Sequence, residues 1–188
     1  SLYKDSYETI WVGTRDGPLG FVKPSLDSIL VYKKWNDFEL PSGGFIYTFL
    51  ELDKENILIG TSFGIYLLNH QKGIIERYWT GGSNASYFPH DNVFHLTKDM
   101  DEEGVIWVAT GGGGLIQLIM NNEKLIIEGF KQFTVADGLS NNTIYAVYED
   151  EAGNLWLPSD YGIIQFNKHT HFTKAYLEKD GITYNEFN

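Results

Sequence analysis

The sequence of 188 residues contains no cysteine, has an excess of acidic over basic residues, and has no long apolar run. Without cysteine, disulfide frameworks and thiolate-based structural zinc sites are excluded. A formal net charge of −11 argues against binding of nucleic acid or of an anionic lipid surface, because both require basic protein surfaces. No apolar stretch approaches the roughly 20 residues that span a bilayer, so we expect no membrane span, and no signal peptide heads the sequence.

What the chain has instead is a five-residue pattern that occurs four times. It reads Ile-Trp-Val-Gly-Thr at 10–14, Ile-Leu-Ile-Gly-Thr at 57–61, Ile-Trp-Val-Ala-Thr at 106–110 and Leu-Trp-Leu-Pro-Ser at 155–159. The second positions of successive copies are 47, 49 and 49 residues apart. A fixed period of roughly 40–50 residues indicates an array of identical supersecondary units.

Each repeat predicts four β-strands. An alternating apolar run, such as that at 93–96, leads through an acidic turn into the five-residue pattern, as expected of a hairpin. A glycine turn and a third strand follow, for example at 114–117, and a more polar fourth strand closes the unit near 127–133. No segment shows a sustained helical period, so we expect almost no helix. Four antiparallel strands in a unit of this length are typical of a propeller blade, and the predicted fold is an all-β β-propeller of about four such blades.

The predicted blades begin and end within the repeat pattern. We expect an incomplete first blade at 1–37 that lacks its inner strand, fuller blades at 38–83, 84–135 and 136–180, and the start of a further blade at 181–188. This favours a segment of a larger, seven-bladed propeller over a small ring that the last strand closes. An open segment would expose sheet edges and apolar blade faces, which predicts self-association as a homodimer.

One repeat carries a family resemblance. Residues 138–157 read Gly-Leu-Ser-Asn-Asn-Thr-Ile-Tyr-Ala-Val-Tyr-Glu-Asp-Glu-Ala-Gly-Asn-Leu-Trp-Leu. This resembles the two-component-regulator propeller repeat, which reads roughly G-L-S/P-N/D-N-x-I/V-x-x-I/V-x-x-D-x-x-G-x-I/L-W-I/V-G-T. The chain departs from that pattern at Pro158, where glycine is usual, and at Leu58 of the second unit, where tryptophan is usual. The segment 181–188 is similar to the start of a late blade in these propellers.

The resemblance implies a function. Such repeats are typical of the extracytoplasmic sensor region of hybrid two-component systems, in which propellers precede a membrane span and a histidine kinase. It implies a non-catalytic periplasmic module of an inner-membrane protein that senses an oligosaccharide from glycan breakdown and relays to the kinase. No catalytic residue, metal or cofactor is predicted for the chain. Two other classes stay open: a propeller enzyme, such as a polysaccharide lyase or glycosidase, and a purely structural protein-interaction propeller.

Two motifs that could carry chemistry fit the repeat better as scaffold. Trp11, Trp107 and Trp156 occupy the same repeat position, so we interpret them as packing between blades rather than as sugar-stacking platforms. The Gly-x-Ser-x-Gly pattern at 60–64 precedes a predicted strand, whereas a nucleophile elbow requires a helix. We interpret it as a hairpin turn.

Three further patterns resemble ligand or metal sites without completing them. The four glycines at 111–114 lack the lysine and the helix of a phosphate-binding loop. The acidic segment 99–104 begins like an EF-hand loop, but the twelfth position falls on Thr110, so we expect a solvated turn. His169 and His171 lack a carboxylate partner at metal-ligand spacing.

The most irregular segment is 80–92, which replaces the shorter connection at 138–143 between an outer strand and the next inner strand. Such crossover connections gather at one rim of a propeller, and loops that vary on a regular scaffold commonly carry binding residues. Amide side chains and an aromatic ring would suit a sugar, which needs directional hydrogen bonds and a stacking face. The candidate ligand-binding residues of this rim are Asn84, Tyr87, His90, Asn92, Asn141, Asn142, Tyr184 and Asn185.

Overall fold

The computed structural model describes residues 1–16, 18–23, 28–31, 44–83 and 86–186. They form four antiparallel sheets of four strands each, and neighbouring strands in every sheet are consecutive in the chain. Helical structure in this part of the chain is limited to short 3-10 turns such as η2 (Val135–Asp137) and η3 (Glu178–Asp180). The prediction of an all-β fold with about four four-stranded blades is therefore confirmed. The chain divides into two compact units, Ser1–Val93 and Phe94–Asn188.

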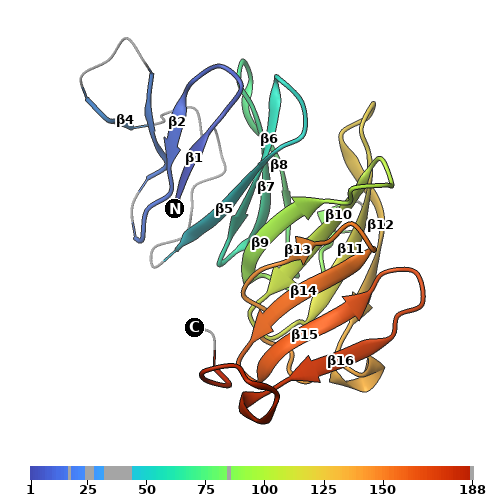
Figure 1. Cartoon of the computed structure of the whole chain (residues 1–188). Helices are drawn as coiled ribbons and strands as arrows, with labels where there is room; N and C mark the ends of the chain where they lie inside the picture. The colour runs from blue at the N-terminus through green and yellow to red at the C-terminus, as the bar shows by residue number, and fades with distance from the viewer. Residues whose placement is uncertain (17, 24–27, 32–43, 84–85, 187–188) are drawn as a thin grey trace. The chain divides into compact units, whose positions relative to one another are not determined.

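The first unit contains two of the sheets (Figure 1). One consists of β1 (Leu2–Lys4), β2 (Ile10–Val12), β3 (Gly20–Val22) and β4 (Leu30–Val31). The other consists of β5 (Ile46–Glu51), β6 (Asn56–Thr61), β7 (Gly64–Asn69) and β8 (Gly73–Tyr78). The faces of the two sheets meet in one apolar core, formed by Trp11, Leu19, Ile46, Phe49, Ile57, Ile59, Tyr66, Leu68 and Ile74.

The second unit repeats this architecture. One sheet consists of β9 (Val93–Lys98), β10 (Val105–Thr110), β11 (Leu115–Asn121) and β12 (Ile126–Phe133), and β9 starts at the last residue of the first unit. The other consists of β13 (Tyr148–Glu149), β14 (Asn154–Ser159), β15 (Gly162–Asn167) and β16 (Thr173–Tyr176). Their common core contains Val105, Trp107, Ala109, Leu115, Phe133, Leu139, Ile144, Val147, Leu155, Leu157, Ile164 and Phe166.

The repeated five-residue pattern forms the second strand of each sheet, namely β2, β6, β10 and β14. Strands β6 and β10 are buried along their whole length. A strand with both faces covered needs a nearly continuous apolar run rather than alternation, which is the composition of the pattern. In these two blades the repeated pattern of the sequence therefore forms a strand that is buried along its whole length.

The first blade corrects one sequence-based expectation. Residues Leu2–Lys4 form β1, which pairs with β2 from Leu2↔Val12 to Lys4↔Ile10. The expectation that this blade lacks its inner strand is wrong, because the Asp5 side chain closes a tight turn by accepting hydrogen bonds from the backbone N–H groups of Tyr7 and Thr9. Three residues before this turn are enough to complete the sheet. The described residues at 181–186 form no strand, so the further blade stays a prediction.

The inner strand of the last blade is interrupted. Ile144 forms an isolated bridge with Ser159, and regular pairing resumes only at Tyr148↔Trp156. The register shift between these two pairs also occurs in the second blade, between Ile46 and Thr48. Pro158 lies opposite this bulge and has no N–H to donate, which explains why the departure from the glycine of the repeat is tolerated here.

A glycine with positive φ begins β7 (Gly64, 97°) and β15 (Gly162, 85°) and directly precedes β11 (Gly114, 77°). A Cβ atom on Gly114 would lie 2.0 Å from the carbonyl oxygen of Phe133 in the fourth strand. The hairpin before the third strand thus requires glycine for both its backbone conformation and the close approach of the neighbouring strand. This supports the interpretation of residues 60–64 and 111–114 as turns between strands.

Among the described residues, no helix has the length and apolar character needed to cross a membrane.

Candidate functional site

In three of the four blades, the end where the first and second strands meet carries an aspartate–tryptophan pair. The indole Nε1 donates a hydrogen bond of 2.8 Å to the turn aspartate in Trp11–Asp5, Trp107–Asp99 and Trp156–Asp150. Trp11 and Trp107 are 2% and 0% exposed, so their rings belong to the core. The interpretation of these two tryptophans as packing residues is confirmed.

The role of the aspartates in these pairs was not predicted from the sequence. Hydrogen bonds from Asn154, Trp156 and Ala152 lower the pKa of Asp150 to about 2. An aspartate precedes each of the three tryptophans by six or eight residues, which is the signal that could have revealed the pairs. Because backbone and side-chain donors of three residues converge on one carboxylate, the pair fixes the turn and orients the tryptophan.

In the second unit, a lysine extends this turn into a junction between two blades. Lys168, which follows β15, is 1% exposed in its side chain, and its Nζ lies 2.7 Å from Asp99 Oδ1 and 2.8 Å from Asp101 Oδ2. The same Nζ donates to Glu149, whose other oxygen accepts from the backbone N–H of Met100. Asp99 is buried, so the expectation of a solvated turn is wrong for this residue, whereas Asp101 is exposed.

The electrostatics of this junction favour full ionisation. Burial by itself would lower the pKa of Lys168, but hydrogen bonds to Asp101, Asp99 and Glu149 outweigh it and raise the pKa above its usual value. Burial would likewise raise the pKa of Asp99, but hydrogen bonds from Lys168, from backbone N–H groups and from Trp107 lower it. Carboxylate atoms of Asp99, Asp101 and Glu149 lie within 4.8 Å of one another, a spacing that could hold a metal ion. Because Lys168 already supplies the positive charge they share, the cluster is an internal salt bridge.

The first unit has the same junction with different chemistry. His70 takes the position of Lys168, because its backbone N–H bonds Glu55 O at 2.9 Å as that of Lys168 bonds Gly153 O at 3.1 Å. Its Nε2 lies 3.5 Å from Asp5 Oδ2 and makes no hydrogen bond with the described residues. Glu51 accepts from the backbone N–H of Ser6 at 3.2 Å, as Glu149 does from that of Met100.

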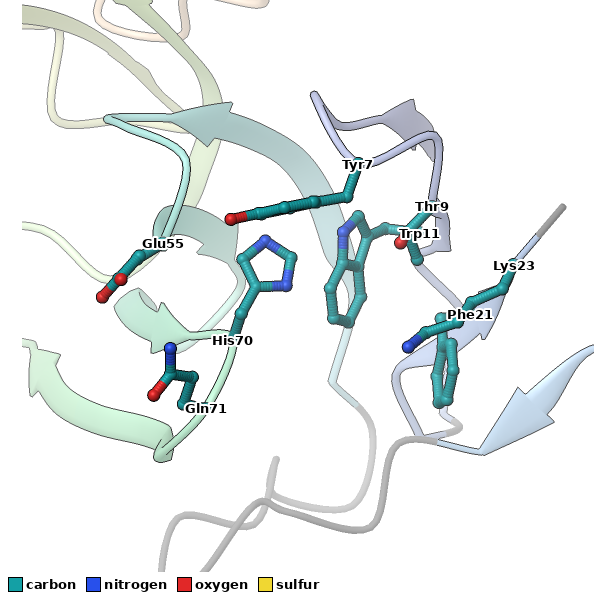
Figure 2. Close-up of a pocket in the computed structure, with 8 residues that line it drawn as sticks. All are labelled: Tyr7, Thr9, Trp11, Phe21, Lys23, Glu55, His70 and Gln71. Carbon is teal, nitrogen blue, oxygen red and sulfur yellow. The ribbon is translucent and has the colours of Figure 1, made fainter.

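A cavity of about 550 Å³ lies beside His70 (Figure 2). Figure 2 shows the His70 ring next to those of Tyr7 and Trp11, with Glu55 and Lys23 on opposite sides of the view. The ring of Tyr7 is inclined by 75° and that of Trp11 by 51° to the ring of His70. The residues that line the cavity are Tyr7, Thr9, Trp11, Phe21, Lys23, Glu55, His70 and Gln71.

The predicted rim residues occupy a different end of the blades. In the second unit, Asn142 and Asn185 are equivalent: their Oδ1 atoms accept from the backbone N–H groups of Val135 and Glu178 at 2.8 and 2.9 Å. Asn141 Oδ1 accepts from Thr143 N at 2.7 Å. These three amides hold the crossover backbone in place.

The remaining rim candidates are less constrained. Tyr184 is 70% exposed and Tyr87 is 41% exposed. His90 Nδ1 accepts from Asn92 N at 3.2 Å, burial lowers the pKa of His90, and Asn92 Oδ1 is buried with no hydrogen-bond partner among the described residues. Asn84 lies outside the described residues. The structure therefore brings His90 and Asn92 together, and the ligand-binding role of the rim stays a prediction.

Comparison with known proteins identifies one repeat. Residues 138–157 match the family model of the two component regulator propeller. A segment of 52 residues is 36% identical to histidine kinase P4 of Formosa agariphila, which corresponds to 28% of this chain and 4% of the kinase.

Solved structures share the fold over a longer stretch. The extracellular domain of the hybrid two component system BT3049 from B. thetaiotaomicron aligns with a TM-score of 0.76 at 24% identity, over 98% of this chain and 24% of that one. The extracellular domain of BT4673 from the same organism aligns with a TM-score of 0.70 at 20% identity, over 93% of this chain and 24% of that one. The chain thus spans about a quarter of each solved relative, and its blades are those of a β-propeller segment. The predicted resemblance is confirmed: residues 138–157 are a two-component-regulator propeller repeat.

Proposed function

We propose that the chain is a non-catalytic sensor module from the extracytoplasmic part of a hybrid two-component system. The observation that carries the proposal is the match of residues 138–157 to the two component regulator propeller, within a fold that also occurs in extracellular domains of such systems. The similarity of 52 residues to a histidine kinase supports the same proposal. In this proposal the module lies in the periplasm, and the histidine kinase lies elsewhere in the full-length protein.

The proposed signal is a soluble oligosaccharide from glycan breakdown, bound at the crossover rim. Each unit offers an exposed ring as a stacking face at its own crossovers, namely Tyr87 in the first unit and Tyr184 in the second. To transmit a signal, the ligand must bind one arrangement of the sensor more tightly than another, because equal affinity for both shifts no equilibrium.

A phosphorylation assay tests this function. Membrane vesicles with the full-length protein would receive labelled ATP, with and without a mixture of soluble oligosaccharides. The proposal predicts that the saccharides change the rate of kinase phosphorylation. The absence of kinase activity, or an unchanged rate with every saccharide, would contradict it.

The chain by itself is proposed to self-associate. Apolar side chains are exposed on the first blade: Leu2 is 75%, Ile29 63%, Leu30 40% and Val31 50% exposed. Exposed apolar side chains favour burial against a second surface. Light scattering over a concentration series should give a mass above 21.4 kDa, the mass of one chain. A constant monomer mass would contradict self-association.

An enzyme is the weaker alternative. Polysaccharide lyases and glycosidases require accessible acidic or basic groups that converge on a substrate. Among the described residues, the carboxylates of Asp99, Asp101 and Glu149 converge, but Lys168 already pairs with all three. This arrangement supports scaffolding over acid–base chemistry.

A further inference from the structure

Each unit contains one blade junction; the two are built on one plan, and that of the first unit departs from it at two positions. Asp5, Ser6 and Glu51 repeat the bonding of Asp99, Met100 and Glu149. Tyr7, two residues after Asp5, replaces an aspartate, and His70 replaces the buried lysine. A junction that needed only mechanical strength could keep the same ion pairs in both places. The departure therefore indicates a different task for the first junction.

The two replacements change what the junction presents. In the second unit, a buried ammonium group and its carboxylates fill the space between the blades. In the first unit, the shorter side chain of His70 is 18% exposed, and Tyr7 is 55% exposed beside it. The cavity opens at this place, so the loss of the ion pairs and the gain of aromatic surface coincide.

The geometry of the cavity limits the chemistry of its ligand. Besides the inclinations of Tyr7 and Trp11 to His70, the rings of Trp11 and Phe21 are inclined by 43°, so these pairs provide no parallel slot for a flat aromatic ligand. Lys23 is positively charged and Glu55 is negatively charged, so the lining of the cavity disfavours a ligand with a net charge of either sign. What remains is a neutral ligand with apolar faces in several directions and with many hydrogen-bonding groups.

We propose that this cavity binds one ring of a neutral saccharide. The C–H faces of the sugar pack against Tyr7 and Phe21, and its hydroxyl groups meet an acceptor in Glu55, a donor in Lys23 and both in Gln71. This site lies at the turn between the first and second strands, whereas the proposed rim lies at the crossovers. The ligand class rests on the proposed function, but the location rests on the cavity and the broken repeat.

The test is saturation-transfer NMR and calorimetry on the purified chain with maltotriose, cellotriose, xylotriose and mannotriose. Adenosine serves as a planar probe and choline as a cationic probe. We expect at least one trisaccharide to bind more tightly than both probes. Tyr7→Ala should weaken its binding about tenfold or more, the change expected for loss of a ring contact, whereas Tyr161→Ala, which truncates a tyrosine that is 50% exposed, should leave it unchanged.

A second variant controls for the possibility that Tyr7→Ala weakens binding through loss of folding. Tyr7→Asp combined with His70→Lys installs the residue types of the second unit's junction, so it should keep the chain folded while an ammonium group enters the space beside Asp5. We expect this variant to unfold at the wild-type urea midpoint or above and to lose trisaccharide binding.

The outcomes separate this site from the proposed function. Binding that survives both Tyr7 variants but is lost in Tyr184→Ala would overturn the cavity and leave the rim and the ligand class standing. Preferential binding of adenosine or choline, sensitive to Tyr7→Ala, would overturn the saccharide assignment. No binding of any trisaccharide would overturn this site together with the ligand class on which it rests.

Discussion

Removal of the buried ammonium group at Lys168 should be the most damaging polar substitution in the second unit. Lys168→Met keeps the length of the side chain but leaves Asp99 and Glu149, which are 1% and 3% exposed in their side chains, without a cation. Breaking a buried ion pair by removal of one partner costs about 3–5 kcal/mol, because the remaining charge is desolvated and uncompensated. Asp101 is 65% exposed and contributes little to this figure.

The pH dependence of the folding stability provides a second, independent test. In the wild type, the lowered pKa of Asp99 gives stability that is fully present above the unfolded-state pKa of about 3.9 and is lost as the pH falls through the folded-state value. The raised pKa of Lys168 gives stability that is present below the unfolded-state pKa of about 10.4 and is lost as the pH rises through the folded-state value. In Lys168→Met, Asp99 loses the hydrogen bond from Lys168 that helps to lower its pKa while the opposing effect of burial remains, so the stability of this variant should fall less steeply than that of the wild type as the pH falls below about 5.

Urea denaturation monitored by tryptophan fluorescence measures both effects. Lys179→Met serves as the control, because Lys179 is exposed on η3, and its change should stay within about 0.5 kcal/mol. Adding Glu149→Gln to Lys168→Met should recover part of the loss. A loss below about 1 kcal/mol for Lys168→Met, or a pH slope equal to that of the wild type, would refute the assignment of Lys168 as the cation that joins the two blades.

Three further predictions concern the scaffold. Gly114→Ala should destabilise the chain by more than about 1 kcal/mol in urea denaturation, whereas Gly129→Ala, where a Cβ meets nothing within 4 Å, should be nearly neutral; equal effects would contradict the strand-spacing argument. The hydrogen bond of 2.5 Å from Tyr145 to Asp160, together with burial, raises the pKa of Tyr145 to about 12, so Asp160→Asn should lower it in an ultraviolet pH titration, and an unchanged value would argue against this bond. Trp107→Phe should cost about 1–3 kcal/mol, because a buried carboxylate oxygen loses its indole donor, and a smaller loss would show that the aspartate–tryptophan pair contributes little.

The strand plan of this fold could be predicted because it depends on local sequence. The apolar pattern at 106–110 becomes β10, and the glycine at 114 precedes β11 as the hairpin requires. The inner strand β1 was missed, because three residues give no periodicity and its pairing depends on the turn that Asp5 closes. Tertiary hydrogen bonds, rather than local propensity, decide such short elements.

The blade junctions could not be predicted in the same way. Lys168 and Asp99 are 69 residues apart, and no local pattern indicates that they meet. The capping role of Asn142 and Asn185 could have been inferred, because they occupy the same place in successive repeats, as scaffold residues do. Recurrence across repeats indicates structure, and departure from recurrence, as at His70, indicates a position with another task.

The most direct test of the account is a combined binding and product measurement on one sample. The purified chain would be titrated calorimetrically with the tightest-binding trisaccharide, and the saccharide would then be recovered and separated by ion-exchange chromatography. A sensor module predicts saturable binding with the trisaccharide recovered intact. Recovery of shorter or unsaturated sugars would contradict the account and identify an enzyme, and the absence of binding heat across the panel would contradict saccharide recognition by this chain.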